Sequence, residues 1–176
     1  MVVLPLLSVV LIGWPFGYAS TPYQPTWAAE YPKRAAIMAL AGPVSNLLLV
    51  LVSALAIRIG IWMAVFGNPP AVSFGQVVVA ANAGMWEGVA FVVSVFFSLN
   101  LLLTIFNLIP VPPLDGSGVV PLFLNSSNTS HYQRFIWGTP MLSWVGILVA
   151  WQLFPSVFRP VWLFLVNWIL DGPGYG

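Results

Sequence analysis

Long apolar runs separated by short polar segments dominate the chain. A spanning helix needs about 20 apolar residues, and two of the runs, Ala35 to Ile57 and Val89 to Ile109, can each cross a bilayer once. A third apolar region extends from Phe135 to Leu170. It predicts either one tilted span with an interfacial helix or a tight helical pair, with a break at Pro155 to Pro160.

A shorter run, Met1 to Gly13, opens the chain. As a helix it would cover about 20 Å, which is less than the hydrocarbon core of about 30 Å. No basic residue precedes it and no small-residue cleavage site follows, so it is not typical of a signal peptide. We interpret it as the second half of a spanning helix that begins outside this sequence. The prediction is an all-α membrane protein, a multi-pass bundle of about four spans.

The polar segments predict little regular structure. Trp14 to Arg34 contains four prolines, which argue against a helix there and favour a short extended segment near residues 16–25. The linker from Gly67 to Glu87 contains one short piece, Gln76 to Ala81, that suits a membrane interface. We predict a single transmembrane domain over residues 1–170, followed by a tail at 171–176.

Composition excludes several classes of protein. Hydrophobic residues make up 60% of the 176 residues and charged residues only 5%, whereas about a quarter of a soluble domain is charged. A net charge of +1 leaves no basic tract for a nucleic acid. The absence of cysteine excludes disulfides and thiolate metal sites. Membrane lipid is therefore the first expected partner.

The few cations predict an orientation. Lys33 and Arg34 precede one span and Arg134 follows the next, so two crossings place them on the same side. The linker between the two spans carries no Lys or Arg after Arg58. By the positive-inside rule, the basic side is cytoplasmic. Asp115, which directly follows the second span, should lie near the same face.

Three asparagines interrupt the apolar runs. Asn46 lies in the first of the two spans, and Asn100 and Asn107 share one face of the second because they are seven residues apart. Polar groups in a membrane either serve function or hydrogen-bond between helices, and the residues alone leave both roles open.

Small residues in the Asn46 helix predict where it is approached closely. Gly42 and Pro43 should kink the helix. Ala39 and Gly42 should let the helix that carries Asn100 and Asn107 come close.

Few side chains could carry chemistry. Asp115 is the only acid between Gly88 and Leu170, and Gly116 follows it, so it could form a turn, cap a helix or serve a site. His131 is the only histidine. A zinc site needs three or four protein ligands, so these two residues alone cannot form one. Glu30 and Glu87 are expected to be interfacial rather than catalytic.

Four ordered segments resemble one family. Asn107-Leu-Ile-Pro-Val-Pro-Pro-Leu-Asp115-Gly116 resembles the N-L-x-P-x-P-P-L-D-G signature of the site-2 protease family of intramembrane zinc metalloproteases. Upstream, Ala41-Gly-Pro-Val-Ser-Asn46 is similar to that family's A-G-P-x-x-N element. Phe16-Gly-Tyr-Ala19, with Pro32-Lys33-Arg34 after it, and the Leu4-Pro5-Leu6 helix match the compact bacterial members. The resemblance covers Met1 to about Leu124.

The resemblance implies roles for particular residues. Family members hold zinc with two histidines of an H-E-x-x-H helix and a distant aspartate, which Asp115 matches. Substrate-binding roles are implied for Asn46 and for an extended segment that could pair with a substrate strand, Gly17, Tyr18 and Ala19. Structural roles fall to Gly42, Pro43, Asn100, Asn107 and Gly116. This sequence contains no H-E-x-x-H, so the implied zinc site is incomplete here and activity as an enzyme stays open.

Two functions follow from these observations. The first is a fragment of an intramembrane zinc metalloprotease, inactive alone because the two His ligands and the Glu base are absent. The alternative is a non-catalytic pseudoprotease, a membrane scaffold or subunit that binds transmembrane segments. A third alternative, an unrelated channel or carrier subunit, would require that the motifs arose by chance. Either of the first two predicts a prokaryotic cytoplasmic membrane and a transmembrane protein as substrate or partner subunit.

Overall fold

The computed structural model describes residues 25–139, 141–170 and 174–175. The chain divides into two compact units, residues 1–30 and 31–176, and each is described by itself. The described part of the first unit is helix α2 (Pro25–Glu30). The opening apolar run and almost all of the expected extended segment at 16–25 lie outside the described residues. A single domain over residues 1–170 stays a prediction.

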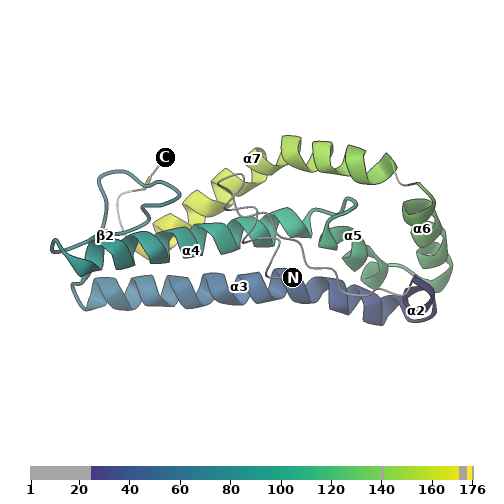
Figure 1. The fold of residues 1–176 in the computed structure, drawn as a ribbon, viewed down its shortest axis with the longest axis horizontal. Coiled ribbons are helices and arrows are strands. Elements are labelled where there is room, and N and C mark those ends of the chain that lie inside the picture. The colour runs from purple at the N-terminus through teal and green to yellow at the C-terminus, as the bar shows by residue number, and fades with distance from the viewer. Residues whose placement is uncertain (1–24, 140, 171–173, 176) are drawn as a thin grey trace, which may run out of the picture. The chain divides into compact units, whose positions relative to one another are not determined.

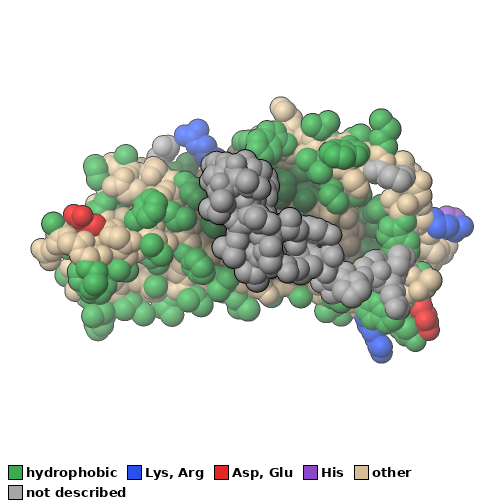
Figure 2. All heavy atoms as spheres, in the orientation of Figure 1, with side chains coloured by type: hydrophobic (Ala, Val, Ile, Leu, Met, Phe, Trp, Pro, Cys, Tyr) green, Lys and Arg blue, Asp and Glu red, His purple; other side chains and the backbone are tan. Residues whose placement is uncertain are grey.

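Helices make up most of the second unit. Those described are α3 (Pro32–Trp62), α4 (Met85–Leu108), α5 (Asp115–Val119), the 3-10 helix η1 (Val120–Phe123), α6 (Ser126–Gly138) and α7 (Met141–Leu170). Among the described residues, α3, α4 and α7 are long and apolar enough to cross a membrane. The all-α membrane class is therefore confirmed. Apolar side chains cover much of the visible surface in Figure 2, as contact with lipid requires.

Helices α3 and α4 pack side by side along their length (Figure 1). On α3, every seventh residue from Ala36 through Pro43 and Val50 to Ile57 is buried. A seven-residue repeat keeps one seam of a helix facing its neighbour. Phe97 and Leu101 are buried on α4. The predicted pairing of the two asparagine-bearing helices is thus confirmed.

Two helices begin with a proline within residues 14–34, where we had expected the prolines to exclude a helix. Pro25 and Pro32 are the first residues of α2 and α3. Proline suits this position because its fixed φ is helical and the missing N–H would have had no partner there. Lys33 and Arg34 therefore belong to the first turn of α3, and the Arg34 guanidinium lies 5.0 Å from the centre of the Tyr31 ring.

Helix α7 corrects a second expectation. It is continuous through Pro155 and Pro160, and the apolar region is instead divided between α6, which ends at Gly138, and α7, which begins at Met141. A membrane helix tolerates proline where neighbouring groups support it. Phe154 stacks on Phe158 at 5.1 Å and meets Phe106 of α4 at 5.5 Å. Near its far end, the Trp162 indole donates to the Ser98 hydroxyl at 2.9 Å.

The linker between α3 and α4 forms a small hairpin, which we had not predicted. Strands β1 (Phe66–Gly67) and β2 (Val79–Ala80) pair antiparallel. The buried Ser94 hydroxyl of α4 accepts hydrogen bonds from the amides of Val77 and Val78, at 3.0 and 3.2 Å. These bonds hold the linker against the N-terminal half of α4. Close by, Arg58 of α3 donates to the Ile169 carbonyl at the end of α7, at 2.8 Å.

Candidate functional site

Asp115 is the first residue of α5, and the preceding loop brings it back toward the helix pair. Ile109 has an extended backbone that ends α4. Within the loop, the Val111 amide donates to the Ile109 carbonyl at 2.8 Å and the Leu114 amide donates to the Val111 carbonyl at 3.0 Å. These short-range bonds form a tight reversal, which the prolines favour because they cannot continue the helix.

Gly116 allows α5 to lie directly against the end of α4. A β-carbon at this position would collide with the carbonyl oxygens of Leu108 and Ile109. On the opposite side of the loop, a β-carbon at Gly146 of α7 would collide with the Pro112 carbonyl. Backbone atoms cannot move aside as a side chain can. Two glycines therefore fix the loop that carries Asp115 between α4 and α7.

The Asp115 carboxylate lies against α3. A β-carbon built on Gly42 would be 3.0 Å from Asp115 Oδ2. Two residues after Gly116, a β-carbon on Gly118 would be 2.8 Å from the Ala39 β-carbon. Ala39 and Gly42 therefore face α5, and the expectation that Gly42 contacts α4 is wrong. The small residues admit a short helix and its carboxylate rather than the neighbouring span.

The asparagines differ in their surroundings. Asn46 is half-buried one turn beyond Gly42 on the same face of α3, and Asn107 is half-buried in the last turn of α4. No hydrogen bond of either side chain to another described residue is found. Asn100 is buried, and its amide donates to the Phe96 carbonyl of its own helix at 2.7 Å. Asn46, one turn from the Gly42 contact, and Asn107, in the last turn before the loop that leads to Asp115, thus retain polar capacity.

The burial of Asp115 and the potential metal ligands among the described residues define the chemistry that Asp115 could support. The carboxyl is half-buried, and this burial raises its pKa above the ordinary value. In residues 25–139, 141–170 and 174–175 no group of three or more His, Cys, Asp or Glu side chains could hold a metal ion. His131 is exposed on α6. Asp115 therefore has too few potential ligands around it among the described residues to complete a zinc site. Gly17, Tyr18 and Ala19 lie outside them.

Sequence analysis missed the groups that hold α5 in place. The Tyr132 hydroxyl of α6 donates to the Ser117 carbonyl at 2.8 Å, and burial raises its pKa. Gly118 admits Ala39, as described above. The closely spaced glycines of Asp115-Gly-Ser-Gly118 were a signal for this close packing. Nothing in the pattern pointed to Tyr132.

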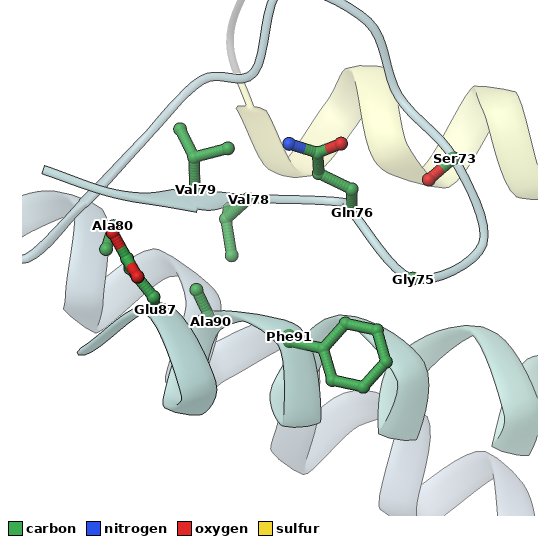
Figure 3. Close-up of a pocket in the computed structure, with 9 residues that line it drawn as sticks. All are labelled: Ser73, Gly75, Gln76, Val78, Val79, Ala80, Glu87, Ala90 and Phe91. Atoms are coloured by element: carbon green, nitrogen blue, oxygen red, sulfur yellow. The ribbon is translucent and has the colours of Figure 1, made fainter. Parts of the chain in front are cut away.

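A pocket at the other end of α4 is separate from Asp115 (Figure 3). It encloses about 470 Å³ between the hairpin linker and the start of α4, where Ala90, Phe91 and the exposed Glu87 line it. Glu87 lies in the first turn of α4, whereas Asp115 follows the C-terminal end of the same helix. Since α4 is about 36 Å long by its rise per residue, the pocket is not part of the Asp115 site.

Comparison with known proteins defines the class. The model of Peptidase family M50 matches residues 8–144, and the chain belongs to this family. It is 31% identical over 173 residues to Rip2 of Mycolicibacterium smegmatis, covering 97% of this chain and 55% of Rip2. It is 26% identical over 175 residues to YwhC of Bacillus subtilis, covering 89% of this chain and 74% of YwhC. Both relatives carry names that designate them zinc metalloproteases. The chain thus spans about half the length of Rip2, and no solved structure matches it significantly.

Proposed function

We propose that this chain forms the aspartate-bearing part of an intramembrane zinc metalloprotease, with Asp115 as one zinc ligand. The observation that carries the proposal is the placement of Asp115 against Gly42. A carboxylate is a common zinc ligand, and a metal ion would offset the cost of keeping it ionised where it is half-buried. The site lies about 15 Å along the axis of α3 from Pro32, which suits a peptide bond near the membrane surface.

The remaining zinc ligands would come from outside this sequence. The family's H-E-x-x-H supplies two imidazoles and a glutamate, and no such string occurs here. Gly42 is exposed on α3 although it lies beside the carboxylate, so a further helix can approach this face. We propose that a helix carrying H-E-x-x-H packs there, and that the chain is inactive without it.

Substrate binding would use the amides near Asp115. Asn46 lies one turn from Gly42, and its side chain could hydrogen-bond a substrate backbone that has been drawn out of its helix. Gly17, Tyr18 and Ala19 would provide an edge for pairing with such a strand. The substrate would be a transmembrane protein. The bacterial relatives support a prokaryotic cytoplasmic membrane, with the Asp115 end facing the cytoplasm.

The test uses the longest reading frame that contains this chain, purified and supplied with a model transmembrane peptide. We expect cleavage by the unmodified protein and none by Asp115→Asn, which keeps the shape of the side chain and removes its charge. Glu87→Gln is the matched control, because it makes the same change at the other end of α4 and should leave cleavage intact. Cleavage by Asp115→Asn at the normal rate would refute the role of Asp115.

A further inference from the structure

Helix α6 is held on the protein by one face. Thr129 and Gln133 are buried, and Tyr132 donates to the Ser117 carbonyl of α5. These residues are three and four apart, so they share one side of the helix. The Asn125 side chain caps the start by accepting a hydrogen bond from the Asn128 amide at 2.9 Å. A fixed inner face gives α6 a defined outer face.

The outer face combines an arginine, a histidine and aromatic side chains. His131 and Arg134 are exposed and Phe135 is 60% exposed, while Trp137, four residues after Gln133, is 44% exposed at the flank of this face. The Arg134 Nε donates to the Ser130 carbonyl of its own helix at 3.3 Å. No ion pair involving Arg134 is found among the described residues. Aromatic rings beside a cation are typical of the membrane–water boundary, where one part of a surface is apolar and the other polar.

The length and direction of α6 agree with a location at the membrane–water boundary. At 13 residues it is about 20 Å long, too short to cross the hydrocarbon core. It runs across the direction of α3 and α4 in Figure 1, as a helix lying in the membrane plane would. It also leads directly into the spanning helix α7.

Further cations lie at the same end of the protein. The helix η1, which immediately precedes α6, packs against α3, whose first turn carries Lys33 and Arg34. Among the described residues of the second unit, the acids are Glu87 at the other end of α4 and the half-buried Asp115. Lys33, Arg34 and Arg134 outnumber the half-buried Asp115 and Glu30, which comes three residues before Lys33, so the local excess of one positive charge is complementary to an anionic surface.

We propose that α6 lies on the membrane and binds the phosphate of an anionic phospholipid through His131 and Arg134, with Phe135 and Trp137 at the level of the lipid headgroups. A bilayer is favoured over an acidic protein because Arg134 lies among large apolar rings on a helix that leads into a spanning helix. The proposal concerns a surface outside the Asp115 site, and it does not depend on proteolysis.

The experiment places a nitroxide label on the outer face of α6. The chain contains no cysteine, so Ser130→Cys creates a single attachment point. The labelled protein is reconstituted in nanodiscs of phosphatidylcholine with increasing fractions of phosphatidylglycerol, and label mobility and depth are measured. We expect an interfacial depth and a loss of mobility that saturates with phosphatidylglycerol. Arg134→Gln should raise the phosphatidylglycerol fraction at half-saturation about fivefold, the usual effect of one cation at an anionic membrane.

Arg159→Gln is the matched control, since it removes the same charge from α7, far from the label. It should leave the half-saturation unchanged. An excess of soluble glycerophosphate that abolishes the response would show that the site takes free phosphate rather than lipid. A response that Arg134→Gln does not alter would overturn the assignment of the headgroup site. A label in open water at every lipid composition would overturn the placement of α6 on the membrane.

Discussion

Asp115 Oδ2 and the α-carbon of Gly42 lie so close that a β-carbon on Gly42 would be only 3.0 Å from that oxygen. The two residues are far apart in the chain, one within a spanning helix and the other after the end of the next. Their contact places a half-buried carboxylate against a helix face that includes Asn46. The proposed metal role depends on this contact, since it determines where the carboxylate points.

Gly42→Leu should destabilise the helix bundle, because the larger side chain must displace Asp115 or push α5 off α3. Overpacking of this kind typically costs about 1–3 kcal/mol. Thermal unfolding in detergent should show a lower midpoint. Gly88→Leu is the control, since a β-carbon on Gly88 of α4 meets nothing within 4 Å. Equal midpoints for the two variants would show that the Gly42 contact is not constrained.

Gly116→Ala should destabilise the protein strongly although it adds only one methyl group. The added methyl group meets two backbone carbonyls of α4, so α5 must shift as a unit, and we expect a loss of about 2–3 kcal/mol. Unfolding in mixed micelles of increasing SDS content measures the change. Gly138→Ala, at a glycine whose surroundings are open, should be close to neutral. If Gly116→Ala is equally neutral, the loop does not hold α5 against α4.

Ser94→Ala should loosen the linker between α3 and α4 without unfolding the spans. The change leaves the buried amides of Val77 and Val78 without their acceptor, which costs about 1–3 kcal/mol locally. Hydrogen exchange at these two amides should accelerate, while exchange in the middle of α4 should not. Ser45→Ala removes a hydroxyl that bonds only within α3 and serves as the control. Unchanged exchange at residues 77 and 78 would contradict the role of Ser94.

The membrane orientation can be tested with single cysteines. Ser73→Cys in the α3–α4 linker and Ser127→Cys at the start of α6 are both exposed. In intact cells, a membrane-impermeant thiol reagent should label Ser73→Cys, and Ser127→Cys should react only after the cells are opened. The expectation follows from the cations near α6 and the positive-inside rule. Labelling of both variants from the same side would contradict the topology.

Apolar patterning predicted the spans well because length and hydropathy alone decide whether a helix can cross a bilayer. Helices α3 and α4 begin three and four residues before their apolar runs, since prolines and charges are compatible with a first turn. The break at Pro155 to Pro160 was predicted wrongly because proline was weighed without its neighbours. Aromatic contacts such as that between Phe106 and Phe154 support the helix there.

The site was predicted in part. The motif around Asp115 indicated a residue at the start of a short helix, which the structure has. The small residues Ala39 and Gly42 predicted a close approach, but the predicted partner was the helix of Asn100 and Asn107 rather than α5, since a helix pattern records spacing rather than what packs on it. The hydroxyl of Tyr132 could not be anticipated, because its carbonyl partner belongs to the backbone of a segment fifteen residues earlier.

Zinc stoichiometry tests the central claim most directly. The 176-residue chain alone, dialysed against zinc and then against buffer, should retain little metal, because no three potential ligands come together among its described residues. The longest reading frame, if it encodes H-E-x-x-H, should retain about one zinc per chain, and Asp115→Asn should lose it while Glu87→Gln keeps it. A full equivalent of zinc on the chain alone, or on Asp115→Asn in the longer protein, would contradict the account.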